Sequence, residues 1–308
     1  MDDQLTLPRA IGAQTKRRRR LRPAGGALVL LGGLLAGCGQ SATPLADADP
    51  GLLHVHGLAV DPDDPEALFA ATHTGLFRIK GSEAVRVGED WHDLMGFTTA
   101  PDGTFYASGH PDLQSEALRT ADGDPHLGLV RSTDRGRNWE PVSLLGEVDF
   151  HALTLAGDTL IGADAANGRV LASEDEGETW QERSRLPLVS LAAHPADPQL
   201  LVGSSSEGLA RSVDGGRTWT ALDGPAPGYL TAGVGGFVMA QAQGEVAVSD
   251  DGAAWRTVGA LPGPPEAMVR GTDERELFAA VADVGLLRSE DGGRSWVAIY
   301  ETPGVSGR

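Results

Sequence analysis

The amino-acid sequence predicts an all-β fold, a β-propeller of six four-stranded antiparallel blades. One eight-residue pattern, Ser-x-Asp-x-Gly-x-x-Trp, recurs along the chain, and its tryptophans lie 36 to 41 residues apart. Short alternating apolar runs lie between the copies, bounded by Asp-Pro, Asp-Gly and Gly-Gly turns, as is typical of strands. A repeat of this length built from short strands indicates a propeller, and seven blades are the alternative if a degenerate blade is hidden in a neighbour.

The repeated motif is predicted to form a hairpin corner. Its Ser and Asp side chains can bind the amides of a tight turn, its Gly can adopt a positive φ, and its Trp can anchor the outgoing strand in an apolar seam. A fifth copy, from Ser249 to Trp255, is one residue short. The four complete copies consist of Ser132, Asp134, Gly136 and Trp139; Ser173, Asp175, Gly177 and Trp180; Ser212, Asp214, Gly216 and Trp219; and Ser289, Asp291, Gly293 and Trp296.

These copies resemble the Asp-box, or BNR, repeats of sialidases, sortilin-type receptors and related β-propellers. The resemblance implies that the motif lies in the turn between the third and fourth strands of a blade and has a structural role there. It therefore predicts the fold and says little about an activity.

Residues 1–37 are predicted to be a lipoprotein signal peptide. A basic segment, residues 16–22, precedes an apolar run that is too short to span a bilayer. The run ends in Leu35-Ala36-Gly37-Cys38, which resembles the lipobox of bacterial lipoproteins and implies cleavage before Cys38 and lipid attachment to it. We therefore expect an exported protein, anchored by lipid in the bacterial cell envelope on the extracytoplasmic side. The alternative for Cys38 is a chance free thiol.

Cys38 is the only cysteine, so a lipidated chain would have no thiol left for a disulfide or a metal. Residues 38–51 are small, polar and without periodicity, as expected for a flexible tether, and residues 303–308 form a short tail. Between them, residues 52–302 are predicted to form one propeller domain. Its six units are residues 52–90, 91–145, 146–186, 187–224, 225–261 and 262–302; in the first unit the motif has degenerated to Lys80-Gly-Ser-Glu-Ala84.

The charge of the chain argues against a nucleic-acid partner. Residues 1–37 contain seven of the 25 basic and two of the 43 acidic side chains, so the remainder has 18 basic and 41 acidic, a net charge of about −23. Such a surface repels nucleic acid and anionic lipid headgroups. It also disfavours a polyanionic ligand, unless a local basic pocket receives it.

The histidines are unevenly distributed between the repeats. Only His194 lies beyond the third unit, and the other seven are His54, His56, His73, His92, His110, His126 and His151. In a propeller, the innermost strand begins on the same face as the loop that joins strands two and three. Since most of these histidines open a first strand or end a second one, we expect them on one face, near the mouth of the channel, opposite the motif turns.

Convergent histidines indicate a transition-metal site, because imidazole-rich sites suit zinc, copper, iron or nickel. The candidate ligands are His54, His56, His73, His110 and His151, with Asp93 or Asp149 supplying a carboxylate. The alternative is that each histidine hydrogen-bonds a neighbouring backbone group or caps a turn. An insertion of about fifteen residues, from Asp112 to His126, is predicted on the same face as a lid or as surface filler, where Asp122, Asp124 and His126 can add polar groups.

The segments HVHGL, ATHTGLF, HDLMGF, ASGHP and DFHAL make residues 52–302 similar to a family of bacterial BNR-repeat lipoproteins that are named glycosyl hydrolases by analogy with sialidases. Sialidases need three arginines, a tyrosine nucleophile with a glutamate, and an aspartate. Here only Tyr229 is expected to face the channel, without an obvious glutamate partner, and Phe77-Arg78-Ile79 lacks the proline of the sialidase Phe-Arg-Ile-Pro element. Sialidase activity is therefore disfavoured.

A two-carboxylate glycosidase remains open. Asp93 and Asp149 enter the inner strands of adjacent units, where they can flank a sugar or simply cap turns. The sequence thus leaves two functions: a propeller that binds a protein, glycan or metal ligand through the histidine-rich face of blades one to three, and a hydrolase of glycans.

Overall fold

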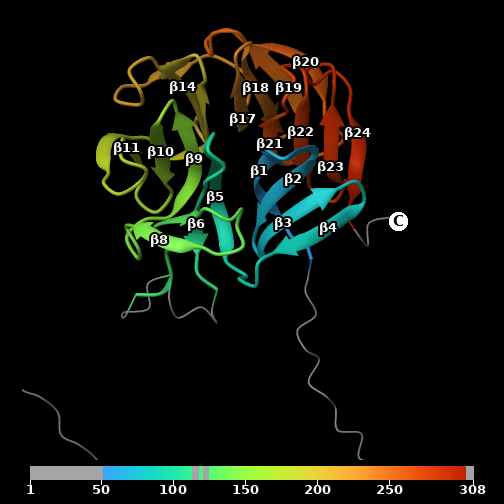
Figure 1. The fold of residues 1–308 in the computed structure, drawn as a ribbon. Coiled ribbons are helices and arrows are strands. Elements are labelled where there is room, and N and C mark those ends of the chain that lie inside the picture. The colour runs from blue at the N-terminus through green and yellow to red at the C-terminus, as the bar shows by residue number, and fades with distance from the viewer. Residues whose placement is uncertain (1–50, 113–117, 121–124, 303–308) are drawn as a thin grey trace, which may run out of the picture. The chain divides into compact units, whose positions relative to one another are not determined.

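The computed structural model of the protein describes residues 51–112, 118–120 and 125–302. These residues form six four-stranded antiparallel sheets arranged as the blades of a β-propeller (Figure 1). The predicted fold class and blade number are confirmed. Cys38, the signal peptide, the tether, the tail, Asp122 and Asp124 lie outside the described residues. Within the described residues we find no helix with the length and hydropathy that a membrane crossing needs.

The strands follow one another from the inner to the outer edge of each blade. The strands of the first three blades are β1 (Val55–Asp61), β2 (Asp64–Thr72), β3 (Gly75–Lys80), β4 (Glu83–Val87), β5 (Asp93–Thr99), β6 (Phe105–His110), β7 (Leu129–Ser132), β8 (Glu140–Ser143), β9 (Phe150–Ala156), β10 (Thr159–Asp164), β11 (Arg169–Ser173) and β12 (Gln181–Arg185). Those of the last three are β13 (Leu188–His194), β14 (Asp197–Ser205), β15 (Gly208–Ser212), β16 (Thr220–Leu222), β17 (Gly228–Gly233), β18 (Gly236–Gln241), β19 (Glu245–Ser249), β20 (Arg256–Ala260), β21 (Pro265–Arg270), β22 (Leu277–Val281), β23 (Gly285–Ser289) and β24 (Val297–Glu301).

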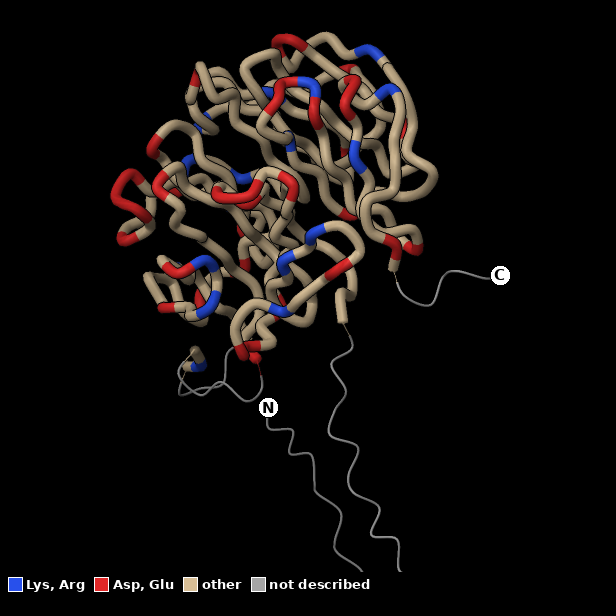
Figure 2. Tube along the Cα trace, turned by 45° about the vertical axis from the view of Figure 1, so that its right-hand side comes forward, with Lys and Arg blue, Asp and Glu red and all other residues tan. Residues whose placement is uncertain are grey.

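The hydrophobic core lies between neighbouring blades. A second strand such as β2 is covered on both faces by adjacent sheets, which is why Ala67–Ala71 is a continuous apolar run rather than an alternating one. The outer fourth strands are mostly exposed or half-buried. Packing of sheet against sheet therefore holds the ring together. Charged residues of both signs are spread along the chain around the ring (Figure 2).

The repeated motif fixes its turn by hydrogen bonds, and in the third and fourth blades its Trp also bonds the blade to the one before it. The Ser212 hydroxyl accepts a hydrogen bond from the amide of Gly216 (2.8 Å) and donates to Oδ1 of Asp214 (2.8 Å). The hydroxyl and amide of Thr218 donate to Asp214 and, as the main causes, lower its pKa to about 2. Trp219 then donates its indole N–H to Ser184 of the preceding blade (3.0 Å). The turn between the third and fourth strands is thereby fixed locally.

The ring is closed without a shared strand. The first blade is made entirely of N-terminal residues and the last entirely of C-terminal ones. Side chains close the seam, since Leu58 and Phe77 of the first blade belong to the same buried cluster as Phe278 and Tyr300 of the last. The backbone N–H of Val55 also donates to a carboxylate of the last blade.

Candidate metal centre at the channel mouth

The six inner strands place one side chain each around the channel mouth. In five blades a register shift leaves one inner-strand residue without a partner on the second strand, and a bulge of this kind redirects a side chain. The bulged residues are His56, Met95, His151, Val189 and Glu266, and Tyr229 takes the corresponding place in the fifth blade, which has no bulge. All except Glu266 line a central cavity of about 530 Å³.

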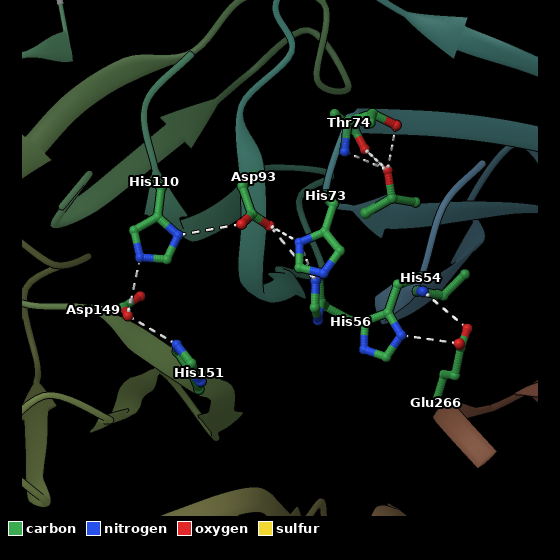
Figure 3. Close-up of polar contacts among 12 residues, drawn as sticks. His54, His56, His73, Thr74, Asp93, His110, Asp149, His151 and Glu266 are labelled. Carbon is green, nitrogen blue, oxygen red and sulfur yellow. Dashed lines mark hydrogen bonds and ion pairs between the residues drawn. The ribbon is translucent and has the colours of Figure 1, made fainter. Parts of the chain in front are cut away.

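The first histidine group comes from the first two blades. His54 precedes β1, His56 lies in β1, His73 follows β2, and Asp93 begins β5. Their side chains converge at the mouth (Figure 3), and one ligand atom from each of the three histidines lies within 4.8 Å of the others. Sequence reasoning predicted this convergence.

Three atoms of this group form a compact triangle. Nε2 of His56 is 3.2 Å from Nδ1 of His73, which is 2.9 Å from Oδ1 of Asp93, and the third side measures 3.6 Å. Ligand atoms bound to one tetrahedral zinc ion at about 2.0 to 2.1 Å are about 3.3 Å apart. A proton on Nδ1 of His73 can form a hydrogen bond with Asp93 or with His56, but not a good one with both. A cation at the centre of the triangle attracts all three atoms. The triangle therefore has the size of a metal site.

His56 has the protonation state that a ligand needs. Burial, followed by the nearby charges of His73 and His54, lowers its pKa to about 3, and the opposite charge of Asp93 only partly offsets this. The imidazole is therefore neutral at neutral pH, so one ring nitrogen has a lone pair available for a metal ion.

Glu266 is a site residue that sequence reasoning missed. Its Oε1 lies 2.9 Å from Nδ1 of His54, and its Oε2 accepts the backbone N–H of Val55 (3.0 Å). A carboxylate bound to the second ring nitrogen of a ligating histidine commonly fixes its orientation. His54 itself has a positive φ of 42°, an uncommon conformation that this contact helps to hold. Aligning the six inner strands, in which Glu266 corresponds to His56, would have identified it.

A second group lies between the second and third blades. It consists of His110 at the end of β6, His126, and Asp149 just before β9, with one ligand atom from each within 4.8 Å of the others. Oδ2 of Asp149 is 3.4 Å from Nε2 of His110 and 2.8 Å from Nε2 of His151. Burial opposes ionisation of Asp149, but the hydrogen bond from His151 and the histidine charges outweigh it and lower its pKa.

Three residues considered in the sequence analysis lie outside the two histidine groups. His92 does not join the cluster, because it is 1% exposed and its Nδ1 accepts the amide N–H of Asp112 (2.9 Å). His194 accepts an amide N–H in the turn after β13, away from the histidine groups. Arg78 binds the carboxylates of Asp61 and Asp64 rather than a substrate.

Tyr229 makes no hydrogen bond to a glutamate within the described residues, although a glutamate lies near it on the next blade. Tyr229 lines the cavity as expected, and Glu266 on the next blade is close enough for its charge to add to burial in raising the pKa of the tyrosine. Sequence reasoning did not connect the two residues because Glu266 is 37 residues further along the chain and comes near Tyr229 through the packing of adjacent inner strands.

The two aspartates predicted as a pair do not face each other across an open space. His110 lies between them, with Nδ1 3.3 Å from Oδ2 of Asp93 and Nε2 3.4 Å from Oδ2 of Asp149 (Figure 3). Inverting glycosidases separate their carboxyl groups by about 6.5 to 9.5 Å to admit a water and the sugar. In this protein an imidazole ring occupies the space between the carboxylates.

Comparisons place the chain among propellers with several functions. It is 26% identical to a xyloglucanase of a Paenibacillus species over 298 residues, which cover 82% of this chain and 27% of that protein. The solved GH74 xyloglucanase of Xanthomonas campestris is 18% identical with a TM-score of 0.55, over 81% of this chain and 46% of that one. YCF48, solved with a D1 peptide, is 16% identical with a TM-score of 0.52, over 80% and 81%. No protein-family profile matches.

These likenesses define the class of the protein as a six-bladed β-propeller with glycosyl-hydrolase-like neighbours. The two solved structures are below 20% identity and indicate the fold alone. The chain spans about a quarter of the length of the curated xyloglucanase that it matches, so the activity of that enzyme is not transferred to it.

Proposed function

We propose that the protein binds a transition-metal ion through His56, His73 and Asp93 at the mouth of its central channel. The observation that carries this proposal is the triangle of ligand atoms, with sides of 2.9, 3.2 and 3.6 Å. His54 stands beside the triangle, where Glu266 orients its ring, and is the candidate fourth ligand. Zinc, copper and iron suit this imidazole-rich donor set.

The proposed ion would lie above a cavity that can receive a small ligand. Polar groups make up most of the exposed cavity wall, and apolar side chains such as Leu58, Leu153, Leu191 and Met268 line the rest. With His56, His73 and Asp93 alone as ligands, the fourth position of a tetrahedral site is open to an incoming group, whereas binding of His54 would close it. The lipid predicted on Cys38 would hold this site in the cell envelope on the extracytoplasmic side, and we propose that location together with the site.

Elemental analysis of the purified chain tests the proposal. After stripping with a chelator and dialysis against zinc, copper or iron, we expect near-stoichiometric retention of at least one of these metals. Changing His56 and His73 to alanine together should remove the ion from this group because two of its three closest ligands are lost. His194→Ala is the matched control and should retain the wild-type content. A folded wild-type chain that resists loading with all three metals would contradict the proposal.

The second candidate is hydrolysis of a glycan, and the comparisons favour it over metal binding. The curated relative is a xyloglucanase, whereas none of the three compared proteins is named for a metal. Asp93 and Asp149 would be the catalytic carboxylates, as acid and base. A glycosidase mechanism would have to explain how a sugar binds between these carboxylates when the imidazole of His110 lies there.

Release of reducing sugar from xyloglucan and other β-glucans tests the second candidate. If the carboxylates act as acid and base, Asp149→Asn and Asp93→Asn should each lower the rate by about 10²- to 10⁴-fold, and chelation should have no effect. Wild-type protein that releases no sugar above the buffer level would remove this candidate. Hydrolysis that disappears on chelation and returns with zinc would instead assign the reaction to the metal site.

A further inference from the structure

The protein has two histidine groups, and the side chain of Asp93 connects them. Its Oδ1 lies 2.9 Å from His73 in the first group, and its Oδ2 lies 3.3 Å from Nδ1 of His110 in the second. The other nitrogen of His110 points to Asp149 (3.4 Å). One carboxylate thus contacts a candidate ligand of each group.

We propose that a second metal ion binds between His110, His126 and Asp149, and that Asp93 orients His110 for it while serving as a ligand of the first ion. This inference rests on the proposed metal-binding function. It predicts a two-metal centre in which the two sites share a residue but have separate sets of histidines.

Buried polar atoms without partners support the second site. Asp149 is only 6% exposed, and its Oδ1 has no hydrogen-bond partner among the described residues. Nδ1 of His126 is likewise buried and unpaired within the described part of the chain. Since a buried polar group without a partner costs about 1 to 3 kcal/mol, two such atoms in one cluster indicate that a ligand completes it.

The donor set resembles that of known metal sites in its chemistry. Two imidazoles and one carboxylate can hold zinc or iron and leave a position open for water or a substrate. The ring of His151 lies against Asp149 with an Nε2 to Oδ2 distance of 2.8 Å, so it can add a further nitrogen or fix the carboxylate. Asp93 accepts a hydrogen bond from Nδ1 of His110, the ring nitrogen that does not face Asp149. Carboxylates commonly hold ligating histidines in this way.

Counting zinc ions in matched variants tests the second site. We expect two ions per wild-type chain, one in His126→Ala, one in His73→Ala, and none in the double variant, each measured on protein whose circular dichroism spectrum is that of the wild type. One ion in the wild type would overturn the second site and leave the proposed function standing. No ion would overturn both, and two ions in His126→Ala would place the second ion elsewhere.

Zinc titration calorimetry tests the role of Asp93. His73→Ala and Asp93→Ala should both lose the first ion, but only Asp93→Ala also loses the acceptor for His110. We therefore expect the remaining ion to bind about 10- to 100-fold more weakly in Asp93→Ala than in His73→Ala. Equal affinities in the two variants would show that Asp93 does not orient His110.

Discussion

Removing the proposed metal ions is expected to lower the free energy of unfolding by about 4 kcal/mol for each ion, compared with protein kept at a free metal concentration of about a thousand times Kd. The reason is that the proposed ligands come from separate strands. His56, His73 and Asp93 lie together only when the first two blades are folded against each other, so the unfolded chain lacks the site.

Urea unfolding with excess zinc and with a chelator measures this effect. The variant with both His56 and His73 changed to alanine is the control, and any remaining difference between its two curves reports the second site alone. Identical unfolding curves for the wild-type chain in zinc and in chelator would mean that no ion binds the folded state preferentially.

Truncation of Phe150 to alanine is expected to cost about 3 to 5 kcal/mol of stability, the range found for large aromatic residues in well-packed cores. Phe150 is fully buried, and its ring centroid is 4.9 Å from that of Trp180. Gly162 has no side chain and so leaves room for the ring of Phe150. A Cβ at position 162 would lie 2.5 Å from that ring. Because the backbone N–H of Phe150 also binds Ser108 of the neighbouring blade, the residue fixes the position of Asp149 and His151 on either side.

Phe278→Ala is the matched control for this substitution. Phe278 is 2% exposed in the cluster that joins the last blade to the first, so we expect a similar loss in urea unfolding experiments. Only Phe150→Ala should also weaken metal binding at the group that contains Asp149. A loss below about 1 kcal/mol for Phe150→Ala, or equal effects of both variants on metal binding, would contradict this account.

The fold could be predicted because its determinants are local. The motif from Ser212 to Trp219 specifies one turn through side chains that bind amides two to four residues away. The spacing between copies of the motif indicates the length of one blade and hence the number of blades. The convergence of the histidines was also predictable, since topology alone brings the start of each first strand and the end of each second strand to one face. His56 and His73 meet for that reason.

The finer structure of the site depends on features that the sequence does not display. Bulges decide which inner-strand side chain turns toward the channel, and they arise from the pairing with the second strand. Glu266 reaches His54 across 212 residues, and His126 returns to Asp149 at the end of an insertion. His92, beside Asp93, was expected at the face but is buried against Asp112. Each outcome is set by tertiary packing.

The closure of the ring by side chains has a mechanical consequence. Because no strand is shared across the seam, a pulling force on the chain before Gly51 is not borne by a continuous ladder of backbone hydrogen bonds between the first and last blades. It first reaches the carbonyl groups of Gly51 and Leu53, which accept hydrogen bonds from the hydroxyl of Thr74 and the amide of His73. It then reaches His54 and Val55, which bind Glu266 of the last blade. The contacts loaded earliest therefore lie at or next to proposed metal ligands, so we expect tension on the N-terminal side to disturb the site before the blades separate.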